Sequence, residues 1–138
     1  MTHFYNHQAY IDLNDSQKEA VKNLDGPLLV LSGAGTGKTR VLTARLANLL
    51  YSNKTKPWNI LAVTFTNKAA KEMRIRLESL IGPSANSVWL GTFHSIAARI
   101  LRENAEVVGL NSNYTIITPD DQIRLLKQIM IDQDIDIK

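Results

Sequence analysis

The sequence predicts an α/β fold in which helices flank a parallel sheet. Three short apolar runs, at 28–31, 60–63 and 88–90, have the length of strands, and each precedes a segment whose apolar residues have helical spacing. Strands that alternate with helices form βαβ units, whose strands are parallel and whose crossovers are right-handed. Ligands bind such sheets at the carboxyl ends of the strands, so the residues after each run are the candidates for a binding site.

Composition and length limit the class of protein. The chain has 138 residues, which is enough for one domain with a core and too few for two. No apolar run approaches the ~20 residues of a membrane span, and residues 1–12 lack the pattern of a signal peptide. The absence of cysteine excludes disulfides and thiolate metal sites. We therefore predict a cytoplasmic protein without membrane contact.

The formal net charge of +3 permits binding to nucleic acid but does not establish it. The distribution of the cations says more, because four lie within residues 68–76 and two more at Arg99 and Arg102. A solvated helix face would give the same pattern at either cluster.

The first part of the chain contains an unpatterned stretch and then a helix signal. Residues 1–12 show no periodicity, and we predict a flexible tail. Asn14 or Asp15 is a suitable cap for a helix that reaches about Asn23. Gln17 lies three residues after Asn14, where it completes a capping box. Its amide also has the donor and acceptor that adenine recognition needs, although the local pattern favours capping.

A glycine-rich loop joins the first apolar run to the next helical segment. Lys38 and Thr39 close this loop, and Val41 and Leu42 begin the helical spacing. Glycines let the backbone curl and aim N–H groups at phosphate oxygens, while the lysine adds a point charge and the threonine a Mg²⁺ ligand. An ordinary glycine turn into a helix is the alternative, but strand, loop and helix together favour a nucleoside triphosphate site. The loop reads Ser32-Gly33-Ala34-Gly35-Thr36-Gly37-Lys38-Thr39, with serine where the general pattern has its first glycine.

The second run ends at an aromatic residue with polar neighbours. Phe65 could stack on a base of single-stranded nucleic acid or could plug the core beneath the following helix, and spacing does not separate these interpretations. Thr66, Asn67 and Lys68 could contact phosphates at the start of that helix, which ends at Gly82.

The third run ends in a similar way, at Gly91-Thr92-Phe93-His94-Ser95. Read alone, His94 is better explained as a core or capping histidine than as a ligand-binding one. A further helix carries Ile96, Ile100 and Leu101 on one face.

The last part of the chain breaks the alternation of strands and helices. Residues 114–117 are either a short strand or a packed loop. Thr118 is a suitable cap for a helix with proline at its first position and acidic residues in its first turn. Its inward face is predicted to consist of Ile123, Leu126, Ile129 and Met130.

Four of these motifs occur in an order that resembles a known family. Leu13 to Gln17, Ser32 to Arg40, Ala62 to Ala70 and Gly91 to Ser95 resemble the Q motif and motifs I, Ia and Ib of superfamily 1 DNA helicases of the UvrD/PcrA/Rep type. The resemblance covers about residues 13–137. It implies a P-loop NTPase (RecA-like) parallel sheet with flanking helices, truncated at the start of a helical insertion. Residues 13–117 would be a partial RecA-like ATP-binding domain 1A, and residues 118–138 the start of helical subdomain 1B.

The resemblance also implies roles for individual residues. Gln17 would read adenine, Lys38 and Thr39 would be catalytic, and Thr39 would ligate Mg²⁺. ATP would be held by Gln17 together with Ser32, Gly33, Ala34, Gly35, Thr36, Gly37, Lys38, Thr39 and Arg40. Single-stranded DNA would contact Thr64, Phe65, Thr66, Asn67, Lys68, Thr92, Phe93 and His94.

The implied activity is an ATP-dependent motor that moves 3′ to 5′ on single-stranded DNA and unwinds duplexes in DNA repair or replication. Its partners would be single-stranded DNA, junctions of single- and double-stranded DNA, and repair proteins. The Asp-Glu motif and second motor domain of the family are absent from these 138 residues, so we expect this chain alone to bind ATP weakly and hydrolyse it negligibly. Two alternatives stay open: the motor part of a helicase–nuclease subunit, and a nucleotide-gated DNA-binding module without catalysis.

Overall fold

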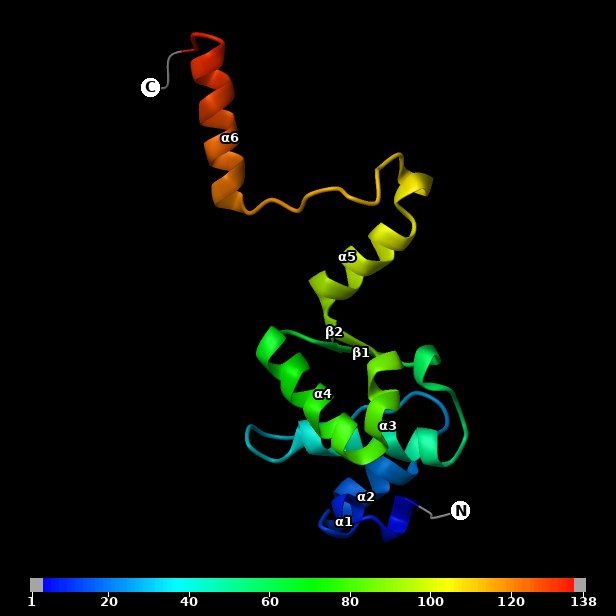
Figure 1. Ribbon diagram of the computed structural model, residues 1–138. Coiled ribbons are helices and arrows are strands. Elements are labelled where there is room, and N and C mark those ends of the chain that lie inside the picture. The colour runs from blue at the N-terminus through cyan, green and yellow to red at the C-terminus, as the bar shows by residue number, and fades with distance from the viewer. Residues whose placement is uncertain (1–3, 136–138) are drawn as a thin grey trace. The chain divides into compact units, whose positions relative to one another are not determined.

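The computed structural model describes residues 4–135 (Figure 1). The chain divides into two compact units, Met1–Ala98 and Arg99–Lys138, and each is described by itself. The first unit contains η1 (Phe4–Asn6), α1 (Gln8–Ile11), α2 (Asp15–Lys22), α3 (Lys38–Tyr51), η2 (Pro57–Asn59), β1 (Leu61–Thr64), α4 (Asn67–Ile81), η3 (Gly82–Ser87), β2 (Trp89–Thr92) and the start of α5 (Phe93–Glu103).

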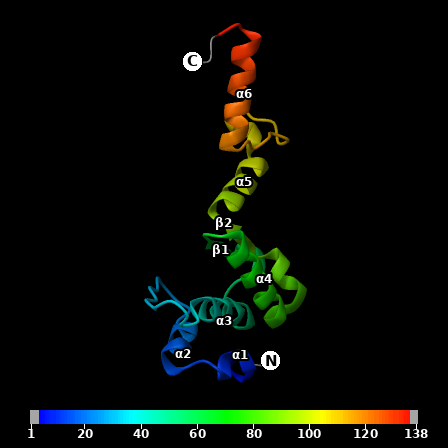
Figure 2. The same cartoon turned by 90° about the vertical axis from the view of Figure 1, so that its left-hand side faces the viewer.

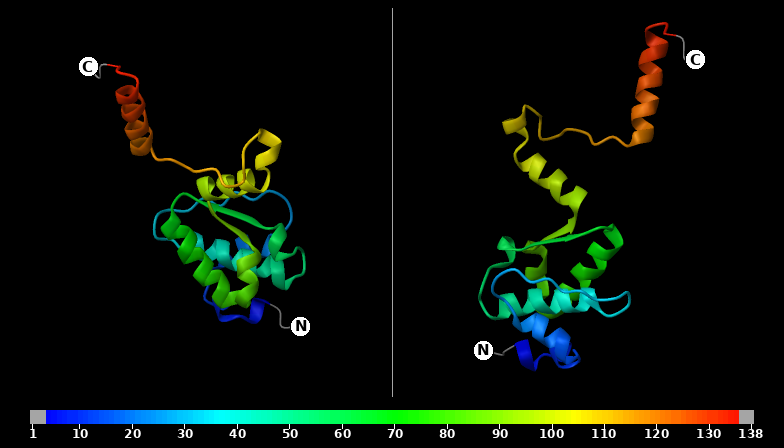
Figure 3. Two further views of the ribbon diagram at one scale, coloured as in Figure 1. Left: turned by 45° about the horizontal axis from the view of Figure 1, so that its top comes forward. Right: turned by 180° about the vertical axis from the view of Figure 1, so that it is seen from behind.

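Strands β1 and β2 form a parallel two-stranded sheet, as the alternating pattern predicts. Leu61 lies opposite Trp89 and Thr64 opposite Thr92, so both strands end at the same edge. The connection between them runs through α4, which lies beside the strands in both views of Figure 3. Met73 and Leu77 on α4 are 3% and 0% exposed, because they pack with the inward residues of the strands.

A second core cluster joins the amino-terminal helices to α3. Helices α2 and α3 pack against each other (Figure 2), and Val21, Ala44 and Ala47 are buried between them. The Asn48 side chain is also buried, and its Nδ2 donates a hydrogen bond to the Val21 carbonyl at 2.9 Å. Buried polar groups of this kind need such a partner. The amide therefore fixes α3 against the end of α2.

Residues 4–11 differ from the predicted flexible tail, whose first three residues lie outside the described part of the chain. They form η1 and α1, and Phe4 and Tyr10 are buried. The Phe4 ring lies 5.6 Å from the ring of Tyr51 on α3. Single aromatic anchors bury a large area without any helical periodicity. Helical periodicity in the sequence therefore does not predict that a single buried ring anchors this segment.

The run at 28–31 is not a strand, so the prediction of a buried strand there is wrong. Leu29 and Leu31 are 81% and 83% exposed. A strand is stable only when its backbone N–H and C=O groups pair with a neighbouring strand. Within residues 4–135, β1 pairs with β2 alone, and no third strand joins this sheet.

The second unit contains the end of α5, η4 (Ala105–Val108) and α6 (Pro119–Asp132). Residues 114–117 form no strand, and the Arg102 guanidinium lies 5.5 Å from the centre of the Tyr114 ring. The prediction of an inward face on α6 is wrong for Ile123, Leu126 and Ile129, which are all exposed. The spacing of these residues is that of an amphipathic helix, but the described residues leave this apolar face of α6 exposed.

A capping box fixes the start of α6 and gives it a pH dependence. Thr118 donates from its hydroxyl and its backbone N–H to the Asp121 carboxylate, at 2.7 and 3.0 Å. These hydrogen bonds hold the pKa of Asp121 below its usual range. The charged carboxylate therefore stabilises the helix start above the unfolded pKa of about 4, and this contribution is lost as the pH falls through the folded pKa.

Replacing Thr118 with alanine is expected to raise the pKa of Asp121 towards its ordinary value, because both the side-chain donor and the cap are lost. Carbon-detected NMR titration of the carboxyl group measures this shift directly. Thr115→Ala, in the preceding segment, is the matched control and should leave the titration unchanged. An unchanged pKa in Thr118→Ala would contradict the capping assignment.

Candidate nucleotide and nucleic-acid site

The glycine-rich loop turns sharply at two of its three glycines. Gly35 and Gly37 have φ angles of 75° and 83°, in the left-handed region that residues with a Cβ atom rarely adopt. Gly37 is also the N-cap residue of α3. A Cβ atom added to it would lie 3.3 Å from Nε2 of Gln17. The prediction that glycine is needed for curvature is therefore confirmed at these two positions, whereas Gly33 has no positive φ.

The Lys38 ammonium lies against the loop that precedes it. Its Nζ donates to the carbonyls of Ser32 at 3.1 Å and Gly33 at 2.6 Å, and the Thr36 hydroxyl donates to the Gly33 carbonyl at 2.8 Å. The loop is thus closed by its own side chains. Thr39 follows in the first turn of α3, where the helix dipole favours negative charge. A cation and a helix start therefore meet at one loop.

Gln17 both caps α2 and supports the loop. Its Oε1 accepts from the Asn14 N–H at 3.1 Å, and the Asn14 side chain accepts from the Gln17 N–H at 2.9 Å, so the predicted capping box is confirmed. Its Nε2 donates to the Thr36 carbonyl at 3.0 Å. No sequence pattern predicted this second contact, which spans nineteen positions of the chain. An amide nitrogen has two donor hydrogens, and the hydrogen bond to Thr36 uses one of them.

A small cavity opens beside the loop. Its volume is about 150 Å³, whereas complete ligand pockets have volumes of ~300–1,000 Å³. The cavity is therefore smaller than a complete ligand pocket. The cavity is lined by Asn14, Ser16, Gln17, Ala20, Val30, Leu31, Ser32, Thr36, Lys38 and Val41.

Arg40 lies one residue beyond the loop and forms an ion pair. Its Nη2 is 3.2 Å from Oδ2 of Asp12, which lies between α1 and α2. Both side chains are 45% exposed. The resemblance assigns Arg40 to the triphosphate, but nothing in the sequence indicated that a carboxylate holds it.

Two exposed aromatic rings lie together at the carboxyl ends of the strands. Phe65 follows β1 and is 91% exposed, and Phe93 follows β2 and is 57% exposed. Their ring centres are 5.7 Å apart at an angle of 51°. The interpretation of Phe65 as a core plug is therefore wrong. Because the strands are parallel and adjacent, sequence positions 65 and 93 become neighbours at one edge.

The polar residues around this aromatic pair divide into two groups. Thr64 and Thr92 are buried and bond locally: the Thr64 hydroxyl donates to the Thr66 carbonyl at 3.0 Å, and the Thr92 hydroxyl accepts from a backbone N–H at 3.2 Å. Thr66 caps α4 through the Ala69 N–H at 3.1 Å. The exposed group is Asn67, Lys68 and His94, so the interpretation of His94 as a core histidine is wrong.

One of the clustered cations on α4 has a structural role. Arg74 donates through Nη2 to the Leu90 carbonyl at 2.8 Å and through Nη1 to the Ala85 carbonyl at 3.3 Å. It fastens α4 to β2 and η3 instead of facing solvent. Lys68, Lys71 and Arg76 on the same helix are exposed.

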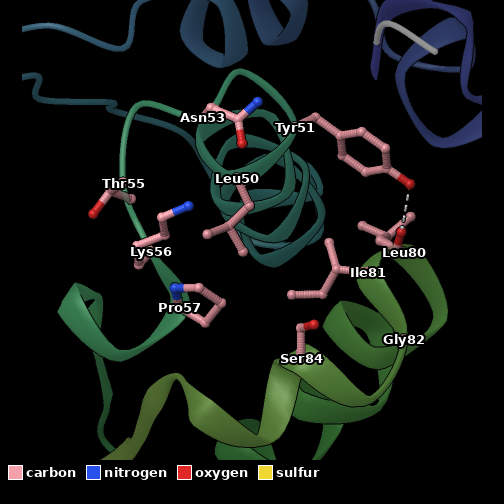
Figure 4. Close-up of a pocket in the computed structure, with 10 residues that line it drawn as sticks. All are labelled: Leu50, Tyr51, Asn53, Thr55, Lys56, Pro57, Leu80, Ile81, Gly82 and Ser84. Atoms are coloured by element: carbon pink, nitrogen blue, oxygen red, sulfur yellow. Dashed lines mark hydrogen bonds between the residues drawn. The ribbon is translucent and has the colours of Figure 1, made fainter. Parts of the chain in front are cut away.

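A separate cavity of about 520 Å³ lies between the ends of α3 and α4 (Figure 4). At its rim, the Tyr51 hydroxyl donates to the Leu80 carbonyl at 3.0 Å. None of the residues predicted to bind ATP or DNA lines it. Within residues 4–135, no group of three His, Asp or Glu side chains could hold a metal ion, and no helix has the length and apolar character to cross a membrane.

Comparison with known proteins identifies the family. The chain is 49% identical over 135 residues to the ATP-dependent DNA helicase PcrA of Bacillus subtilis (strain 168), covering 98% of this chain and 18% of that protein. It is 51% identical over 127 residues to PcrA of Staphylococcus epidermidis and 50% identical over 126 residues to PcrA of Staphylococcus aureus (strain Mu50), each time covering 17% of the relative. The chain thus spans less than a fifth of their length. The model of the UvrD/REP helicase N-terminal domain matches residues 13–138, so this chain belongs to that family.

Proposed function

We propose that this chain is the ATP-binding part of a DNA helicase that uses ATP to move 3′ to 5′ on single-stranded DNA. In this proposal it forms part of a RecA-like P-loop domain that works in the cytoplasm, in DNA repair or replication. About 50% identity to PcrA helicases over most of the chain supports the motor class. The roles of the individual residues rest on the geometry of the loop and of the strand ends.

The observation that carries the proposal is the exposed pair Phe65 and Phe93 at the strand ends of a chain that also has the glycine loop. A single exposed apolar side chain is common, but two adjacent exposed rings form an apolar patch, and such patches mark interaction sites. Base–aromatic stacking contributes ~1–3 kcal/mol per base and tolerates any sequence, as a translocating motor requires.

The surroundings of the aromatic pair suit a nucleic-acid backbone. The amino terminus of α4 at Asn67 and Lys68 presents N–H groups and a cation beside Phe65. His94 adds an exposed donor beside Phe93. In this arrangement the rings take the bases and the helix start takes a phosphate.

At the loop, Lys38 would exchange its carbonyl partners for the β and γ phosphates of ATP, and Gln17 would keep the loop curved while its free N–H meets the adenine. Thr39 would hold Mg²⁺, which neutralises phosphate charge when bound. The loop backbone from Ser32 to Gly37, including Ala34 and Gly35, would line the phosphates. The carboxylate and the arginines of phosphoryl transfer are absent from this chain, so we expect it to bind ATP with negligible hydrolysis.

The motor part of a helicase–nuclease subunit and a non-catalytic DNA-binding module use the same two surfaces. Both alternatives predict ATP and DNA binding by this chain. They differ from the main proposal in activities that these two surfaces do not determine, so experiments on the two surfaces test what the three have in common.

Fluorescence anisotropy with a labelled oligothymidine across a salt series tests the proposal. Affinity should fall linearly on a log–log plot, with a slope of about −0.7 for each phosphate neutralised. A blunt duplex of the same length is the control and should bind more weakly, because its bases are unavailable for stacking. Equal affinity for the two DNAs, or no binding by folded protein, would overturn the DNA surface.

A further inference from the structure

We propose that Asp12 is a positioning residue that restrains Arg40 in an ion pair which a bound nucleotide must break. The carboxylate therefore weakens nucleotide binding at the loop. This inference rests on the proposed function, because it assumes that the loop and Arg40 receive a triphosphate. It concerns a residue outside the four motifs to which the resemblance assigns roles.

The Asp12 carboxylate is held from two sides. Its Oδ2 lies 3.2 Å from Nη2 of Arg40, and its Oδ1 accepts a hydrogen bond from Nε2 of Gln8 on α1. Helix α1 is itself anchored, because Phe4 and Tyr10 on either side of Gln8 are buried in the core. The carboxylate is thus placed by a folded segment, unlike a carboxylate on a loose surface side chain.

Arg40 is well placed to reach a nucleotide once it leaves Asp12. It is the third residue of α3 and directly follows Thr39, so it lies in the first turn after the loop. Together with Gly37 it lines a cavity of about 430 Å³. Arg76 is the other cationic residue in the lining, and the lining contains no carboxylate. Within residues 4–135, Arg40 forms its ion pair with Asp12.

The strengths of the competing interactions permit this exchange. Ion pairs between half-exposed side chains are weak, whereas arginine–phosphate hydrogen bonds are charge-assisted and often bidentate. A triphosphate can therefore displace Asp12. It does so against two opposing effects, the loss of the ion pair and the repulsion between the carboxylate and the phosphates.

Asp12→Asn removes both opposing effects and keeps the size and the acceptor for Gln8. We expect it to lower the dissociation constant of a fluorescent ATP analogue with Mg²⁺ by about 3- to 10-fold. Asp12→Glu keeps the charge and should bind as the unmodified chain does. Asp25→Asn is the matched control: it breaks another exposed ion pair, with Lys54 at 2.6 Å, and should leave the dissociation constant unchanged.

A double-mutant cycle with Arg40→Ala separates restraint of the arginine from simple repulsion. If Asp12 acts by holding Arg40, Asp12→Asn should give less than half of its gain when Arg40 is absent. A gain of full size in the Arg40→Ala background overturns the proposal, and so does an unchanged dissociation constant in Asp12→Asn. Failure of the unmodified chain and every variant to bind the analogue would instead overturn the proposed nucleotide site.

Discussion

Replacing Lys38 with alanine is expected to weaken ATP binding by about 10- to 100-fold, because a charge-assisted hydrogen bond is worth ~1.5–3 kcal/mol. The ammonium already lies within the curve of the loop, at 2.6 Å from the Gly33 carbonyl, so little reordering is needed for it to meet phosphates. Alanine keeps α3 helical and removes the charge together with the two hydrogen bonds to the Ser32 and Gly33 carbonyls. Titration of the chain with a fluorescent ATP analogue measures the change.

Lys22→Ala is the matched control for this experiment. Lys22 is exposed in the last turn of α2 and does not line the cavity beside the loop. Its removal changes the net charge by the same amount, so any general electrostatic effect appears in both variants. Equal affinities for Lys38→Ala and Lys22→Ala would show that the loop lysine does not contact the nucleotide.

Replacing Phe65 with alanine is expected to reduce affinity for single-stranded DNA by about 5- to 100-fold, which corresponds to the ~1–3 kcal/mol of one stacked base. The ring is 91% exposed and contacts Phe93, so the variant should fold as stably as the unmodified chain. Anisotropy with labelled oligothymidine gives the affinity, and a thermal melt checks the fold.

Trp58→Ala provides a control with a ring at the other end of the same strand. Trp58 is 61% exposed in η2, which precedes β1, whereas Phe65 follows β1. If DNA bound exposed aromatic rings only through general hydrophobicity, the two substitutions would reduce the affinity by similar amounts. The prediction fails if Trp58→Ala loses as much affinity as Phe65→Ala.

Sequence patterns predicted best those elements whose stability comes from near neighbours. The caps at Asn14 and Thr118 and the left-handed glycines depend on residues a few positions away, and the structure has them. The parallel pairing of β1 with β2 also followed, because the helix between them fixes the crossover.

The patterns failed where partners are distant in the sequence. The run at 28–31 has strand composition, but pairing requires a neighbouring strand. Phe4 packs on Tyr51, and Gln17 bonds Thr36, through contacts that no local period encodes. The same holds for Arg74, which looks like part of a basic face until its carbonyl partners are known.

The arrangement of β1, α4 and β2 has a consequence for the order of folding during synthesis. All three elements lie between residues 61 and 92, so their contacts close only short loops of chain. Contacts between near neighbours form fastest, and domains begin to fold from the amino terminus as the ribosome extends them. We therefore expect the edge that carries Phe65 and Phe93 to assemble early, once residue 93 has left the exit tunnel. The glycine loop is made earlier, but the run at 28–31 beside it pairs with no strand within residues 4–135.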